Sequence, residues 1–345
     1  MNIKIPQVCL VVLVGPSGSG KTTFARKHFQ PIEILSSDHC RALVSDDEND
    51  QSVTGDAFEV LHLIAGKRLA NQRLTVVDAT SVQPEARKSL IALARQYHCL
   101  PVAIVLNLEP DLCHERNQAR DDRTFEPQVV RQQSEQLRRG LRRLKREGFR
   151  KIAVFESPEQ VDLVTIEREP LWTDRRHEHG PFDIIGDVHG CFDELALLLA
   201  KLGYQMSDDK DNPSATPPDG RKAVFVGNLS ARGPNSPAVL RLVMNMVQAG
   251  NALCVPGHQE IKLLRKLRGK NVKATHGLAE TMEQLDAQPA EFKDSVIEFI
   301  DGLISHYVLD DGNLVVAHAG MPQDLQGRAS AKVRAFAMHG ETTGE

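Results

Sequence analysis

The sequence predicts an α/β protein with two domains, and three observations support this. Short apolar runs alternate with helical patterns in residues 1–169, which is typical of a parallel sheet with helices on both faces. A fresh α/β pattern occupies residues 181–345. The segment between them, residues 170–180, lacks periodicity and lies between prolines, so we expect a linker there. A chain of 345 residues is long enough for two cores.

The composition is that of an ordinary globular protein, with 41% hydrophobic and 26% charged residues. The formal net charge of -4 gives no overall attraction to nucleic acid, so such binding would need a local basic patch. The six cysteines form no Cys-x-x-Cys pair, which argues against a zinc site or a disulfide framework. No cleavable signal pattern and no apolar run of membrane-spanning length is present, so we expect a cytoplasmic protein without a membrane partner.

A glycine-rich segment, Gly15-Pro16-Ser17-Gly18-Ser19-Gly20-Lys21-Thr22, follows the apolar run 8–14 and precedes a predicted helix at 22–29. Glycines let successive backbone amides turn inward around an anion, and the helix start adds unpaired donors. The pattern predicts a P-loop kinase domain that binds ATP with Mg²⁺. We expect Lys21 beside the β- and γ-phosphates and Thr22 on Mg²⁺. The nucleotide-binding set is Gly15, Ser17, Gly18, Ser19, Gly20, Lys21, Thr22 and Thr23.

Further strands are predicted at 32–35, 74–78 and 102–106, with an edge strand at 152–155. Asp38 follows the first of these runs, where a carboxylate could accept a proton from an attacking hydroxyl; the alternative is a helix N-cap. Arg41, one helical turn later, could hold an acceptor phosphate. Asp78 ends the next strand and is expected to have a lesser role, in metal hydration, in positioning or as a cap.

Residues 111–147 are predicted to form a lid. On a helix, Arg116, Arg120 and Arg123 would project from one face, which suits charge stabilisation around a transferring phosphoryl group. A solvated helix containing acidic residues would look similar. The segment 128–149 predicts a strongly basic helix, either as a solvated face or as a contribution to nucleic-acid attraction.

In the second half, polar side chains follow four predicted strands, a pattern that indicates a metal site distributed over loops. Two of these strands are 182–185 and 314–317, and the others end before Gly227 and before Pro256. The segment 207–221 is predicted to be an exposed loop. The candidate metal ligands are Asp187, His189, Asn228, His258 and His318.

Together the phosphate loop, Ser36-Ser37-Asp38-His39-Cys40-Arg41, the arginine lid and Gly186-Asp187-Val188-His189-Gly190 resemble the bacterial polynucleotide kinase-phosphatase of RNA repair systems. The resemblance implies a kinase followed by a metallophosphoesterase-like α/β domain. It implies transfer of the ATP γ-phosphate to 5′-OH ends of single-stranded RNA or DNA. RNA repair proteins and a second copy of the chain are candidate partners. The roles implied are catalysis by Lys21, Asp38 and Arg123, acceptor-strand contact by Arg41, and lid contacts by Arg116 and Arg120.

The second domain departs from this family at its metal motifs. In this chain Asn228 and Ala231 stand in place of the two aspartates of the family pattern Gly-Asp-x-x-Asp-Arg-Gly. At the position of the family pattern Gly-Asn-His-Glu, this chain has Gly257-His258-Gln259-Glu260. A neutral amide bridges two cations poorly. The chain also ends before further ligands of the family, and the family's ligase domain is missing. We therefore expect a degenerate, C-terminally incomplete 2′,3′-phosphatase-like domain that is weak or inactive. Its altered motifs disfavour the binding of Mn²⁺ or Ni²⁺.

Three alternatives stay open from the sequence. The first is a P-loop kinase for a small metabolite. The second is a bifunctional enzyme that keeps residual 2′,3′-phosphatase activity. The third is a second domain that serves as a folded platform for partners or RNA.

Overall fold

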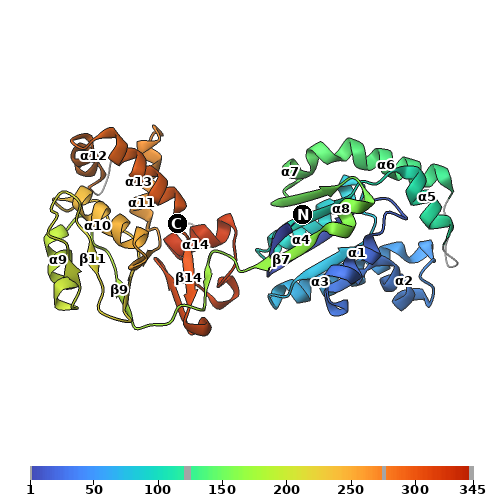
Figure 1. Cartoon of the computed structure of the whole chain (residues 1–345), viewed down its shortest axis with the longest axis horizontal. Coiled ribbons are helices and arrows are strands. Elements are labelled where there is room, and N and C mark those ends of the chain that lie inside the picture. The colour runs from blue at the N-terminus through green and yellow to red at the C-terminus, as the bar shows by residue number, and fades with distance from the viewer. Residues whose placement is uncertain (1, 120–125, 274–276, 342–345) are drawn as a thin grey trace. The chain divides into compact units, whose positions relative to one another are not determined.

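The computed structural model describes residues 2–119, 126–273 and 277–341 (Figure 1). The chain divides into two compact units, residues 1–171 and 172–345. The division lies near the start of the predicted linker, but that segment is not wholly irregular. Strand β8 (Asp174–Arg175) pairs with a strand of the second unit, because residues without a repeating apolar pattern can still complete a sheet edge.

The first unit is built on a five-stranded parallel sheet with the strand order β3-β4-β2-β5-β6. This confirms the predicted P-loop kinase-like α/β class. The order places β2, which leads into the glycine-rich segment, in the centre of the sheet and β6 at an edge. The strands are β2 (Cys9–Val14), β3 (Ile34–Ser36), β4 (Thr75–Asp78), β5 (Leu100–Leu106) and β6 (Lys151–Phe155).

Both faces of this sheet are covered, as the continuous apolar run of β2 requires. Side chains of β2 alternate: Leu10, Val12 and Val14 pack in one core, and Cys9, Val11 and Leu13 in another. The first core includes side chains of α3 (Thr54–Ala70), α4 (Pro84–Gln96) and α6 (Pro127–Gly140). The second includes α1 (Lys21–His28) and β1 (Asn2–Pro6), which pairs in parallel with β7 (Thr165–Glu169). The remaining helices are α2 (Ser37–Ser45), α5 (Pro110–Gln118), α7 (Leu144–Glu147) and α8 (Pro158–Leu163).

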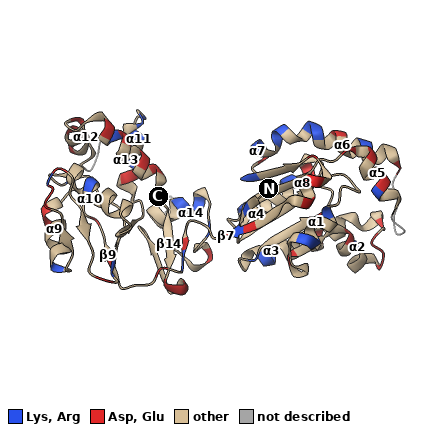
Figure 2. Ribbon diagram, viewed as in Figure 1, with Lys and Arg blue, Asp and Glu red and all other residues tan. Residues whose placement is uncertain are grey.

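The basic segment predicted as one helix over 128–149 is divided in the structure. Helix α6 ends at Gly140, a 3₁₀ turn spans Leu141–Arg143, and α7 ends before Gly148, whose left-handed conformation stops the helix. Figure 2 shows Lys and Arg along α6 and α7. Arg131, Arg138 and Arg139 form exposed ion pairs with Asp111, Glu109 and Glu135 respectively, so acidic neighbours offset part of this charge.

The second unit contains two three-stranded sheets and several helices. One sheet has the order β13-β12-β9 and is parallel; the other has the order β15-β14-β8. Their strands are β9 (Phe182–Ile185), β12 (Lys222–Phe225), β13 (Ala252–Cys254), β14 (His306–Leu309) and β15 (Leu314–Ala317). The helices are α9 (Phe192–Lys201), α10 (Ser236–Gln248), α11 (His258–Leu267), α12 (Leu278–Asp286), α13 (Ala290–Gly302) and α14 (Ala331–His339).

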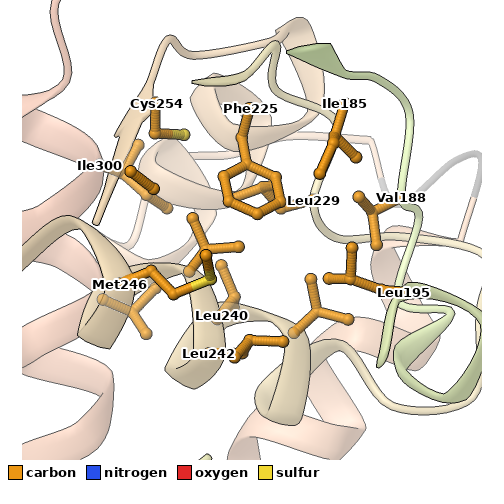
Figure 3. Packing of buried hydrophobic residues seen from close by; sticks show 14 of the residues in the cluster. Ile185, Val188, Leu195, Phe225, Leu229, Leu240, Leu242, Met246, Cys254 and Ile300 are labelled. Carbon is orange, nitrogen blue, oxygen red and sulfur yellow. The ribbon is translucent and has the colours of Figure 1, made fainter. Parts of the chain in front are cut away.

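Alternation along β12 divides the core of this unit. Phe225 packs with side chains of the helices, as the buried cluster in Figure 3 shows, whereas Val224 packs between the two sheets with Tyr307 and Val316. The predicted loop at 207–221 contains β11 (Ala215–Thr216), which pairs with β10 (Gln205–Met206) in a short antiparallel ladder. Among the described residues, none of the helices combines the length and apolar character of a membrane span.

Candidate functional site

The glycine-rich segment turns from β2 into α1 through two glycines with left-handed backbones, Gly18 (φ 78°) and Gly20 (φ 90°). A Cβ on Gly18 would lie 2.0 Å from the carbonyl oxygen of Cys113 on α5, so no larger residue fits. Gly20 gives α1 no side-chain cap, which leaves the first backbone amides of the helix open to a ligand. Lys21 folds back over the loop, and its Nζ donates to the carbonyl oxygens of Gly15 at 3.0 Å and Pro16 at 2.8 Å.

A hydrogen bond joins Thr22, in the first turn of α1, to Asp78, at the end of β4. The Thr22 hydroxyl donates to Asp78 Oδ2 at 2.8 Å, and Asp78 is only 4% exposed at the end of β4. Burial raises the pKa of the Asp78 carboxyl, and the nearby Lys21 charge and the Thr22 hydrogen bond oppose that rise only in part. A partly buried hydroxyl–carboxylate pair beside an open row of amides fits Mg²⁺, which binds through oxygen and accompanies phosphate. The sequence predicted only a lesser role for Asp78. Its position at the carboxyl end of a buried strand, where ligands of such sheets bind, could have indicated a larger one.

Asp38 and Arg41 lie on α2, one turn apart, and form an ion pair. Asp38 is not the helix cap, because the Ser36 hydroxyl accepts from the amide of His39. Arg41 is only 6% exposed, and its Nη1 also donates to the carbonyl oxygen of Glu48 at 3.2 Å. The structure therefore removes the capping alternative for Asp38 and holds a carboxylate and a guanidinium at one place.

One cavity of about 260 Å³ gathers most of the side chains predicted for nucleotide and acceptor. Of the predicted set, Gly15 and Ser19 are buried and are not among its lining residues. Arg116 on α5 lines the cavity, whereas Arg120 and Arg123 lie outside the described residues. The lining residues are Ser17, Gly18, Gly20, Lys21, Thr22, Thr23, Ser37, Asp38, Arg41, Asp78, Ala79, Thr80 and Arg116.

A residue that the sequence did not single out also contacts the phosphate loop. The amide of Ser17 donates to Gln133 Oε1 on α6 at 2.8 Å. The two residues are separated by 116 positions, and a lone glutamine in a basic helix carries no recognisable signal.

In the second unit, three of the five predicted metal residues, Asp187, His189 and Asn228, lie close together. Asp187, His189 and Asn228 have positive φ values of 40°, 48° and 51°, a strained conformation that is typical of functional loops. Asn228 Nδ2 lies 3.3 Å from Asp187 Oδ1, and His189 Nε2 lies 3.4 Å from Asp187 Oδ2. Within the described ranges, no three His, Cys, Asp or Glu side chains are placed to share a metal ion.

The other two predicted ligands form a pair. His258 Nδ1 lies 3.2 Å from His318 Nε2, and His318 Nδ1 lies 2.6 Å from the carbonyl oxygen of Val226. Gln259 Nε2 lies 3.2 Å from His258 Nε2. Burial, followed by the neighbouring His318, lowers the pKa of His258, which favours its neutral form.

Glu260, for which the sequence predicts no role, holds these loops in shape. Its buried carboxylate accepts from the backbone amides of Asn228 at 2.7 Å, Leu229 at 2.8 Å and Gly257 at 2.9 Å. The Gly257-x-x-Glu260 spacing is that of a helix N-terminal capping box, which was the available signal.

Comparisons with known proteins divide the chain in the same way as the structure. Residues 10–144 match the AAA domain family, and residues 180–336 match the calcineurin-like phosphoesterase family. These matches imply nucleotide binding in the first unit and divalent-metal chemistry in the second.

Curated relatives of this chain match about half of its length. A protein of Anoxybacillus flavithermus called bis(5′-nucleosyl)-tetraphosphatase PrpE [asymmetrical] is 42% identical over 168 residues, which cover 48% of this chain and 67% of the relative. The protein of the same name from Bacillus subtilis is 39% identical over 168 residues, with the same coverage. This chain thus spans about two thirds of the length of these relatives.

Among solved structures, a chain of the Pnkp1/Rnl/Hen1 RNA repair complex aligns with 74% of this chain and 81% of its own length. The TM-score is 0.36 and the identity 14%, and a likeness at this level does not bear on function. From the family matches and the 42% identical relative we conclude that the first unit is a kinase-like P-loop domain. Through its second unit the chain belongs to the calcineurin-like phosphoesterase family.

Proposed function

We propose that the first unit transfers the γ-phosphate of ATP to the 5′-OH end of RNA or DNA. The observation that supports this proposal is that Lys21, Asp38 and the Thr22–Asp78 pair surround one cavity. A triphosphate donor needs fixed positive charge and open amides, and an acceptor hydroxyl needs a base. The start of α1 supplies Lys21 and the open amides, and α2 supplies the Asp38 carboxylate.

In the proposed step, the Asp38 carboxylate accepts the proton of the 5′-hydroxyl group. The 5′ oxygen then bonds to the γ-phosphorus as the bond from that phosphorus to the β,γ-bridging oxygen breaks, and ADP leaves. Lys21 and Arg116 offset the charge that develops on the phosphoryl oxygens. Mg²⁺, held through Thr22 and Asp78, would supply further positive charge beside the phosphates. We also assign charge stabilisation to Arg120 and Arg123.

The choice of a polynucleotide acceptor rests on Arg41 and on the motif that contains it. Arg41 is held beside Asp38, so an acceptor that ends in a hydroxyl and carries a phosphate one nucleotide away could contact both. A phosphate-free metabolite would leave the Arg41 charge without such a partner. Competition between oligonucleotides and small hydroxyl compounds for γ-phosphate transfer separates these two acceptors.

The direct test is transfer of labelled γ-phosphate to a 5′-OH oligonucleotide. Asp38→Asn removes the base and keeps the volume, so we expect a loss of about 10²–10⁴-fold in kcat. Asp56→Asn, which changes an exposed aspartate in the first turn of α3, is the matched control and should leave the rate unchanged. Full activity of Asp38→Asn would contradict the assignment of the base, and no transfer to any oligonucleotide would contradict the acceptor class.

A second candidate function is hydrolysis of a nucleoside polyphosphate by the second unit. The 42% identity to a tetraphosphatase over 168 residues favours it, together with the phosphoesterase match at residues 180–336. The replacement of acidic ligands by Asn228 and Ala231 argues for weak turnover, of either a dinucleoside tetraphosphate or a 2′,3′-phosphate. Assays with Mn²⁺ or Ni²⁺, on wild type and His189→Ala, test this candidate. Robust turnover that disappears in His189→Ala would establish that the second unit is catalytic.

A further inference from the structure

We propose that the polar centre of the second unit accepts at most one divalent cation, between Asp187 and His189. The other half of the centre is closed by a chain of hydrogen bonds through Gln259, His258 and His318. This inference does not depend on the proposed activity of the first unit. It also departs from what the family match implies, which is a centre with its cation-binding groups available.

The direction of this chain follows from its last acceptor. The carbonyl oxygen of Val226 can only accept, so His318 Nδ1 carries a hydrogen and His318 Nε2 presents its lone pair. His258 Nδ1 must then donate to His318 Nε2, which leaves the lone pair of His258 on Nε2. Gln259 Nε2 donates to that atom. Both imidazole lone pairs that a cation would need are already used.

Asn228 closes the middle of the centre in a similar way. Its Oδ1 accepts from the backbone amide of Gln259 at 3.2 Å, and its Nδ2 points at both carboxylate oxygens of Asp187, at 3.3 and 3.4 Å. An N–H group facing a carboxylate takes the place that a cation would occupy. The side-chain amide therefore satisfies the neighbouring groups without metal and adds no negative charge to the centre.

Charge leads to the same conclusion. Asp187 is the one carboxylate among the five predicted ligands, so these ligands supply a single negative charge. Two divalent cations a few ångströms apart would repel each other with little anionic oxygen between them. Glu260 does not change this balance, because its buried oxygens are occupied by backbone amides.

The Asp187–His189 side differs from the histidine side. His189 Nδ1 lies 3.2 Å from the carbonyl oxygen of Ser230 and therefore donates to it, which directs the Nε2 lone pair toward Asp187 Oδ2. Two acceptors that face each other at 3.4 Å call for a proton or a cation between them. This side is where one cation can bind.

The experiment counts bound Mn²⁺ by electron paramagnetic resonance in the nucleotide-free chain of 345 residues. An Asp78→Asn background removes the first-unit carboxylate that could hold the same ion. We expect no more than one Mn²⁺ per chain and no signal from a spin-coupled Mn²⁺ pair. Two tightly bound, coupled ions would overturn the proposal.

The matched variant is Asn228→Asp/His258→Asn in the same background. It supplies an anionic bridge and frees the lone pair of His318, so we expect a second, coupled Mn²⁺. Gln205→Glu adds the same charge at an exposed position on β10 and should leave the count unchanged. Circular dichroism establishes that each variant is folded. A folded double variant that gains no ion would overturn the assignment of these two residues as the closing groups.

A second measurement does not depend on the double variant folding. Because a cation can bind only between Asp187 and His189, any rise in Tm from EDTA to Mn²⁺ should disappear in His189→Ala and persist in His318→Ala. A large rise in Tm with Mn²⁺, removed by His318→Ala but not by His189→Ala, would show a cation bound on the histidine side and would contradict the proposal.

Discussion

Gln133 on α6 accepts the backbone amide hydrogen of Ser17 in the phosphate loop, over a donor–acceptor distance of 2.8 Å. This bond joins the predicted lid to the loop that it would cover. The same helix packs on α5 through Val130, which lies with Cys113 in one buried cluster, and Gly18 approaches Cys113 closely. The phosphate loop and the predicted lid are thus in contact at two places. A substitution in the lid should therefore change how the loop binds its ligand.

Gln133→Ala removes the side-chain acceptor and leaves the Ser17 amide without this partner. We expect the KM for ATP to rise about 5-fold with a smaller change in kcat, since one hydrogen bond that orders the loop is worth about 1 kcal/mol. Steady-state kinetics at saturating oligonucleotide measures this. Gln132→Ala, an exposed neighbour on the same helix, is the control. Equal effects of the two variants would show that Gln133 has no specific role.

Asp78→Asn keeps an acceptor for the Thr22 hydroxyl and removes a buried charge. Burial raises the pKa of Asp78, so its ionised form at neutral pH lowers the stability of the folded state. We expect a Tm equal to or above that of wild type, together with a loss of Mg²⁺-dependent transfer of about 10²-fold or more. Calorimetry and the kinase assay measure the two effects. A lower Tm with activity retained would contradict both expectations.

Arg87 is fully buried at the start of α4, and its guanidinium binds Glu147 on α7 through two hydrogen bonds of 2.8 and 2.7 Å. It also donates to the carbonyl oxygens of Ser81 and Val82. Arg87→Met should lower the free energy of unfolding by about 3–5 kcal/mol, because Glu147 and two carbonyls lose their partner. Urea denaturation measures this change.

Arg142→Met, which alters an exposed arginine in the 3₁₀ turn, is the control and should lie within about 0.5 kcal/mol of wild type. A loss below about 1 kcal/mol for Arg87→Met would mean that water replaces the guanidinium at little cost.

His306 is buried in the second unit, and burial lowers its pKa to about 4. Its Nε2 accepts from the amide of Gly327 at 2.9 Å, so the neutral ring is required there. The unfolded chain takes up this proton near pH 6.5 and the folded chain only near pH 4, so stability should fall as the pH decreases through that window. The full difference corresponds to about 3 kcal/mol.

Urea denaturation between pH 7 and pH 4 tests this expectation. His306→Gln removes the titrating ring and should reduce the slope of stability against pH by up to one proton. An unchanged slope in the folded variant would mean that other groups account for the acid sensitivity.

Much of the first unit could be predicted because its signals are local. Local residue patterns within residues 8–29 predict a buried strand, a glycine turn and a helix, and these elements indicate the fold class. From the sequence Asp38 could be a base or a cap; Ser36 caps α2, so the cap is excluded and the role as base stays a prediction. The contact of Gln133 with Ser17 could not be predicted from the sequence, because it depends on how a distant helix packs.

In the second unit the sequence identified the altered residues but not what they do together. The replacement of acidic ligands by Asn228 predicted a weakened centre. The sequence could not predict that the remaining groups hydrogen-bond to one another. His258 and His318 are 60 residues apart, and the positions of their protons depend on the carbonyl group of Val226 in a third segment.

The sequence by itself determined the two α/β units, the phosphate loop and the loss of acidic ligands in the second half. These features depend on residue type and on spacing within one or two turns or strands. Only the tertiary structure decided that Asp78 meets Thr22, that Gln133 reaches the loop and that the imidazole lone pairs are already used. The reason is physical: hydrogen bonds of this kind require distances near 3 Å between groups far apart along the chain, and only packing sets those distances.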